Sequence, residues 1–138
     1  MSKVVVDASV ALAWCFPDES NRYADAVLVA LAAHQLVEPT IWSMEIANAI
    51  SVGERRARIH ESEIRRFLEL LGGLNVIEDA RRIPEVFNDV LPLARKHAIA
   101  VYDAAYLEVA IRHGAPLATL DKALERAARA TGIPSFNP

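Results

Sequence analysis

The chain has 138 residues, a formal net charge of −3 at neutral pH and a single cysteine. With 53% hydrophobic and 24% charged residues, the composition excludes a disordered chain and fits one globular domain over residues 1–138. The lone cysteine excludes an internal disulfide, and no apolar run approaches the ~18–20 residues of a membrane-spanning helix. We therefore expect a cytoplasmic protein without a membrane partner.

Short β-branched or apolar runs alternate with segments of helical periodicity along the chain. The runs predict strands at residues 3–7, 35–39, 74–77, 116–120 and 133–136. Apolar spacing and composition predict helices at residues 8–16, 21–33, 41–52, 60–71, 84–97, 102–113 and 122–130. This alternation is typical of an α/β sandwich with a parallel sheet, whose ligand sites lie outside the carboxyl ends of the strands.

Four acidic residues stand near the starts of predicted helices, in otherwise apolar sequence. Asp7 and Asp121 each close a strand and open a helix, whereas Glu45 and Asp103 lie in the first turns of theirs. One such acid alone is usually a helix N-cap or a solvated residue. Four carboxylates near a core, with few cations close by in sequence, are costly unless they bind a cation. Because hard divalent cations prefer oxygen ligands, this pattern predicts a Mg²⁺ or Mn²⁺ site.

Three polar residues stand two or three positions from one of these acids: Ser9, Asn48 and Thr119. Each is placed to hold a water molecule or to orient a carboxylate, although local capping is an open alternative for each. The four histidines share no ligand-like spacing and no second thiol is present, so a zinc site is not favoured.

The order of four short motifs resembles the PIN domain family. These are D-A-S from Asp7, E-I-A-N from Glu45, Y-D-A-A-Y around Asp103, and T-L-D ending at Asp121. The matching segments span nearly the whole chain in the family's order. Within the family, the chain is similar to the VapC-type toxins of bacterial and archaeal toxin–antitoxin pairs.

The resemblance implies a three-layer α/β/α sandwich with a five-stranded parallel sheet. It also implies a pocket in which Asp7, Glu45, Asp103 and Asp121 act as catalytic and metal-binding residues. The activity it implies is endoribonuclease cleavage of RNA by a metal-activated water, with Mg²⁺ or Mn²⁺ as cofactor. Asp7 and Asp103 are then the direct ligands, while the number of metal ions stays open. The partners it implies are a VapB-like antitoxin and a second copy of the chain, forming a homodimer.

Other residues allow two readings each. The arginines at 55, 56 and 58 predict contacts with RNA phosphates, or else a solvated helical face paired with nearby glutamates. Trp14, Phe16 and Trp42 are either core residues or part of a groove for an antitoxin helix.

Three other classes of protein are alternatives. A housekeeping PIN nuclease without an antitoxin would share every residue named above. A haloacid-dehalogenase-type phosphatase would need a second aspartate where this chain has Ser9. A non-catalytic binding module has no use for four acids in apolar settings. The net charge of −3 does not exclude RNA, because two divalent ions on the four acids would change it to +1.

Overall fold

The computed structural model describes all residues from 1 to 138. Four parallel strands form one sheet in the order β3-β2-β1-β4. Their bounds are β1 (Ser2–Val6), β2 (His34–Pro39), β3 (Val76–Asp79) and β4 (Leu117–Ala118). The central strand β1 pairs Val4 with Leu36 of β2 and Val6 with Ala118 of β4. Burial on both sides explains the unbroken valine run, since Val4, Val5 and Val6 are fully buried.

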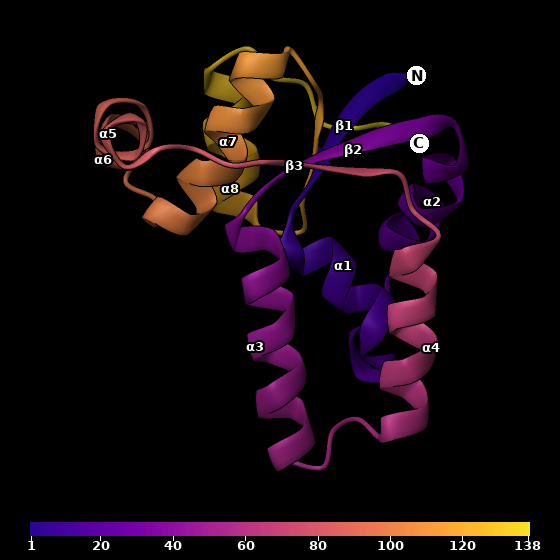
Figure 1. Cartoon of the computed structure of the whole chain (residues 1–138). Helices are drawn as coiled ribbons and strands as arrows, with labels where there is room; N and C mark the ends of the chain where they lie inside the picture. Colours follow the sequence, from indigo (N-terminus) through magenta and orange to yellow (C-terminus); the bar gives the residue numbers. More distant parts are fainter.

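Eight helices surround the sheet: α1 (Ala8–Cys15), α2 (Arg22–Ala30), α3 (Ile41–Arg55), α4 (Glu61–Gly72), α5 (Ile83–Glu85), α6 (Leu91–His97), α7 (Val101–His113) and α8 (Lys122–Ala130). Figure 1 shows α7 and α8 on one side of the sheet and α2 on the other. The long helices α3 and α4 extend together away from the sheet, below it in this view. None of the helices combines the length and the apolar character needed to span a membrane.

The expected architecture is confirmed, with one correction at the edge of the sheet. The predicted fifth strand at 133–136 is a single bridge between Leu117 and Ser135. Two backbone hydrogen bonds join this segment to Leu117. The N–H of Leu117 donates to the carbonyl of Pro134, and the N–H of Phe136 donates to the carbonyl of Leu117. Pro134 has no N–H of its own and β4 itself is only two residues long, so the pairing stops there.

Two helices differ from their predicted bounds in ways that have a clear physical reason. The predicted helix 84–97 is divided by a π-helical turn, η3 (Val86–Val90), into α5 and α6. The third helix continues past Gly53 to Arg55. A Cβ at Gly53 would lie 2.5 Å from Cε1 of Phe16, so this glycine permits close packing of α3 against that ring.

Candidate active site

Asp7 occupies the carboxyl end of the central strand and is the N-cap of α1. The residue is only 4% exposed. Oδ1 accepts hydrogen bonds from Ser9 Oγ at 2.5 Å and from the N–H of Val10 at 3.2 Å. Oδ2 accepts one bond from Thr119 Oγ1 at 2.5 Å. Each carboxylate oxygen has two acceptor positions, so one position on Oδ2 is open for a further partner.

Burial raises the pKa of Asp7 to about 6, against the lowering effect of these hydrogen bonds, and the charge of Asp103 raises it slightly more. Burial disfavours the ionised form of this carboxylate, because water no longer solvates its charge. It therefore gains more from a cation than an exposed aspartate would.

Thr119 joins the first of these acids to the last. Its hydroxyl donates to Asp7 and accepts a hydrogen bond from the backbone N–H of Asp121 at 3.0 Å. Asp121 is the N-cap of α8, where Oδ1 accepts from the N–H groups of Ala123 and Leu124 at 2.8 and 3.0 Å. Ser9 strengthens the link, because its Oγ accepts from the N–H of Leu120 at 3.0 Å. The accessory positions predicted for Ser9 and Thr119 thus lie inside the network.

The remaining two acids come from α3 and α7. Glu45 is half-buried, and its Oε1 accepts a hydrogen bond from the hydroxyl of Tyr106 at 2.6 Å. Asp103 is half-buried in the first turn of α7. Burial raises the pKa of Asp103, and the charges of Asp121 and Glu45 raise it further. Asp103 therefore interacts electrostatically with each of the other three predicted acids.

The four acids are electrostatic neighbours rather than a closed metal cage. No three His, Cys, Asp or Glu side chains converge closely enough to surround a cation by themselves. Mg²⁺ suits this arrangement, since it usually keeps several waters and binds one or two carboxylates together with substrate phosphates. The donor set, all carboxylate oxygens with hydroxyls beside them, fits Mg²⁺ or Mn²⁺. Asn48, by contrast, is exposed and its side chain makes no hydrogen bond to the group.

Two buried residues beside the acids were not among the predicted site residues. Glu38, at the end of β2, is 1% exposed; its Oε1 accepts from the N–H of Val6 at 2.8 Å, while Oε2 has no partner. Burial, then the charge of Asp7, raises the pKa of Glu38 well above its ordinary value. Tyr106 is 1% exposed and holds Glu45. The signal for Glu38 was a glutamate inside a predicted buried strand, L-V-E-P.

The predicted basic cluster lies at the far end of α3. Ten residues separate Glu45 from Arg55, which corresponds to ~15 Å along a helix. Arg58 is engaged within the fold, because it donates to Asp18 and Glu19 at 2.9 Å and lies 4.6 Å above the ring centre of Phe16. Arg55 donates to Ser51 at 3.1 Å.

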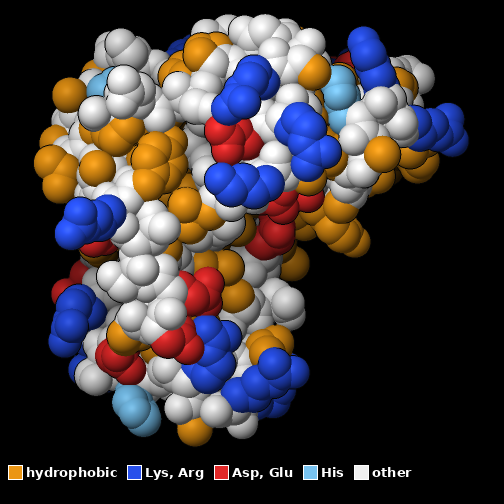
Figure 2. All heavy atoms as spheres, turned by 180° about the vertical axis from the view of Figure 1, so that it is seen from behind, with side chains coloured by type: hydrophobic (Ala, Val, Ile, Leu, Met, Phe, Trp, Pro, Cys, Tyr) orange, Lys and Arg blue, Asp and Glu red, His pale blue; other side chains and the backbone are white.

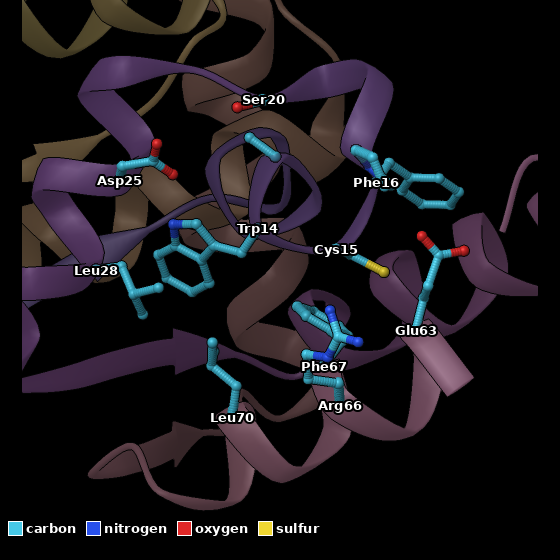
Figure 3. Close-up of a pocket in the computed structure, with 12 residues that line it drawn as sticks. Trp14, Cys15, Phe16, Ser20, Asp25, Leu28, Glu63, Arg66, Phe67 and Leu70 are labelled. Atoms are coloured by element: carbon cyan, nitrogen blue, oxygen red, sulfur yellow. The ribbon is translucent and has the colours of Figure 1, made fainter. Parts of the chain in front are cut away.

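The aromatic residues singled out in the sequence occupy different places. Phe16 and Trp42 are buried in the core. Trp14 is half-buried and lines a hollow of about 260 Å³ between α1, α2 and α4, where its indole N–H donates to the carbonyl of Ala24 at 2.7 Å. Figure 3 shows the Trp14 ring between Leu28 and Leu70, with the buried Cys15 thiol on the side of Glu63.

Comparison with known proteins agrees with this geometry. The model of the PIN domain family matches residues 4–130. Ribonuclease VapC3 of Pyrobaculum aerophilum is 37% identical over 123 residues, which cover 88% of this chain and 92% of that protein.

Two solved structures share the fold. PAE2754 from Pyrobaculum aerophilum superposes with a TM-score of 0.67 at 26% identity, covering 91% of this chain and 79% of that one. VapBC2 from Rickettsia felis, bound to a promoter DNA fragment, gives a TM-score of 0.68 at 12% identity, covering 99% and 98%. The match to the family model spans nearly the whole sequence, and the chain therefore belongs to the PIN domain family.

Proposed function

We propose that the protein is a metal-dependent endoribonuclease and the toxin of a type II toxin–antitoxin pair. The observation that carries the proposal is the buried Asp7, which interacts with Asp103 at the carboxyl edge of the sheet while Asp103 interacts with Glu45 and Asp121. The relative named Ribonuclease VapC3 supports RNA as the substrate.

In the proposed mechanism, Asp7 and Asp103 would hold Mg²⁺ or Mn²⁺, and Glu45 and Asp121 would orient water or a second ion. A divalent ion there would lower the pKa of a nearby water molecule and would place a positive charge opposite the phosphate. Water adds to phosphorus while the bond to the 3′ oxygen breaks, which leaves a 5′-phosphate and a 3′-hydroxyl. Ser9 and Thr119 keep Asp7 in place through their hydroxyl groups. Tyr106 does the same for Glu45.

The proposal predicts that Asp7→Asn and Asp103→Asn each reduce RNA cleavage by about a hundredfold or more, because each removes a negative charge from the cation site. Cleavage of labelled single-stranded RNA measures this, with circular dichroism to check folding. Excess EDTA should stop the wild-type reaction, and added Mg²⁺ should restore it. A folded variant that cuts at the parent rate would show that the site is wrongly assigned.

The same proteins separate a toxin from a housekeeping nuclease. Induced expression of the wild type should arrest growth, whereas Asp103→Asn should be tolerated. We also propose that a VapB-like antitoxin relieves the arrest and that the chain forms a homodimer. Growth unaffected by an active wild-type protein would favour the housekeeping nuclease.

A further inference from the structure

A second polar hollow opens beside the acidic cluster. It has a volume of about 400 Å³ and lies between α2, β4, α8 and the C-terminal segment; we call it the α2–α8 pocket. Thr119, whose hydroxyl donates to Asp7, is one of its lining residues. Lys122, the residue after Asp121, also lines it. The pocket thus shares Thr119 with the hydrogen-bond network of the acids, and Lys122 directly follows one of them.

The pocket combines apolar walls with free hydrogen-bonding groups. Leu117, Leu120 and the ring of Tyr23 form the apolar part. The hydroxyl of Tyr23 donates to the carbonyl of Phe136 at 2.7 Å, which fixes the ring. Asn21 accepts the N–H of Ala24 on Oδ1 at 3.1 Å, so its amide NH₂ is free to donate.

Two charged side chains of opposite sign, Lys122 and Glu125, also line the pocket. Lys122 is exposed and has no ion-pair partner. Glu125 faces the pocket and is held by Arg129, whose Nη2 lies 2.7 Å from its Oε1. A bare phosphate would meet the negative charge of Glu125, and a simple cation would meet Lys122. A ligand that carries an anionic group, a flat apolar ring, N–H donors and a hydrogen-bond acceptor has a partner for Lys122, for the apolar wall, for Glu125 and for the amide of Asn21.

We propose, on the basis of the ribonuclease function above, that the α2–α8 pocket binds the nucleotide next to the scissile phosphate. Lys122 contacts a backbone phosphate, and Glu125 accepts a hydrogen bond from an exocyclic amino group of the base. Recognition of splayed-out bases by such edge contacts is the usual mode for single-stranded RNA. Adenine, cytosine and guanine have an exocyclic amino group and uracil has none, so the pocket disfavours uracil.

The surface around the pocket supports this path for RNA. Three basic side chains of α8 are exposed: Lys122, Arg126 and Arg129. Figure 2 shows basic side chains gathered around an acidic one in the upper middle of the face seen from behind, with further acidic side chains directly below. The α8 helix thus presents positive charge to a phosphate backbone that continues beyond the acids.

Lys122→Gln and Glu125→Gln test the proposal, with Lys96→Gln as the matched control. Lys96 is an exposed lysine of α6 without an ion-pair partner. Lys122→Gln should raise KM about three- to tenfold with kcat within about twofold. It should also lower the slope of log affinity against log salt by about 0.7, the value for one phosphate contact on a single strand.

Glu125→Gln should relax the bias against uracil at one position beside the cut, read by sequencing the ends of a randomised RNA. Lys96→Gln should change none of these.

The outcomes separate this proposal from the ribonuclease function. If the wild type cuts RNA and both pocket variants keep its KM and its sequence bias, the pocket assignment is wrong while the function stands. If the wild type cuts no RNA, the function fails, and binding of single-stranded RNA to Asp103→Asn with and without Lys122→Gln decides the pocket. Equal affinities in that comparison would overturn it.

Discussion

Asp7 serves the fold and the candidate site with the same two oxygens. As N-cap it stabilises the start of α1, yet as a buried charge it destabilises the metal-free protein. Residues placed for function rather than stability often show such perturbed pKa values. The stability of the metal-free protein should therefore depend on the protonation of this one group.

Asp7→Asn is expected to be more stable than the wild type when no metal is present. The pKa of Asp7 is about 6 in the folded protein against an ordinary value of 3.8, so the folded state keeps its proton longer than the unfolded chain. The free energy of unfolding of the wild type therefore falls as the pH rises from about 4 to about 6. At pH 7.5 the asparagine variant should exceed the wild type by ~2–3 kcal/mol, and below pH 4 the difference should vanish.

Urea unfolding in EDTA between pH 4 and 8 measures this difference. A gap between the two proteins that does not change with pH would mean that the Asp7 carboxyl titrates normally.

The candidate site illustrates which residues a sequence can reveal. Asp7 and Asp121 follow strand-like runs, so their position at one edge of a parallel sheet was predictable. The contact between Tyr106 and Glu45 was not, because 61 residues separate them and only the tertiary fold brings their helices, α7 and α3, within reach of each other. The ion pairs of Arg58 could not be predicted for the same reason, since its acidic partners Asp18 and Glu19 lie 40 and 39 residues away in the sequence.

At the scale of the elements, a network of ion pairs connects the edge strand β3 to α7. Most of β3 is exposed. Its last residue, Asp79, accepts hydrogen bonds from Arg112 at 2.8 and 2.9 Å and lies 2.5 Å from His113 Nε2. Arg112 also binds the buried Glu108 at 2.9 Å. These contacts, first with Arg112 and then with His113, hold the pKa of Asp79 below its ordinary value.

Asp79→Asn should lower the free energy of unfolding by about 1–3 kcal/mol at neutral pH, because hydrogen bonds to a charged partner are lost. Since the pKa of Asp79 is lowered in the folded state, this contribution is present above the ordinary value of 3.8 and is lost as the pH falls through the folded value. The two proteins should therefore converge in acid. Glu61→Gln is the control, because it breaks an exposed pair with Arg65 that contributes only ~0–1 kcal/mol.

The bounds of the elements were predicted less well than their order. The alternation of strands and helices follows from hydrophobic periodicity, which the sequence contains. The length of β4 depends on the C-terminal segment beside it. Pro134 in that segment has no N–H, so the pairing is limited to the single bridge between Leu117 and Ser135. Gly53 directly follows the predicted end of the helix 41–52, yet α3 continues through it, and its role comes from Phe16, which approaches it from another part of the chain.

At the scale of the whole molecule, two of the predicted basic residues lie far from the acids. The acids lie where the strands end, whereas Arg55 and Arg56 lie at the far end of the α3–α4 pair, which extends from the body in Figure 1. An RNA bound at the acids reaches these arginines only if it is long enough to follow α3. The contribution of the two arginines should then depend on the length of the RNA.

Reversing both charges in Arg55→Glu/Arg56→Glu should weaken the binding of long single-stranded RNA and flatten its salt dependence, while short oligonucleotides bind as before. Fluorescence anisotropy with RNAs of increasing length measures this. The double reversal Arg95→Glu/Lys96→Glu on α6 controls for the change in net charge. Equal binding at every length would mean that Arg55 and Arg56 form only a solvated helix end.

The buried Cys15 gives the protein a built-in reporter. Burial raises the pKa of its thiol to about 11, so almost no reactive thiolate is present at neutral pH while α1 and α4 stay packed. Because it is the only thiol in the chain, its rate of reaction with a disulfide reagent measures how often that packing opens. The hollow in Figure 3 can thus be followed over time without any engineered label.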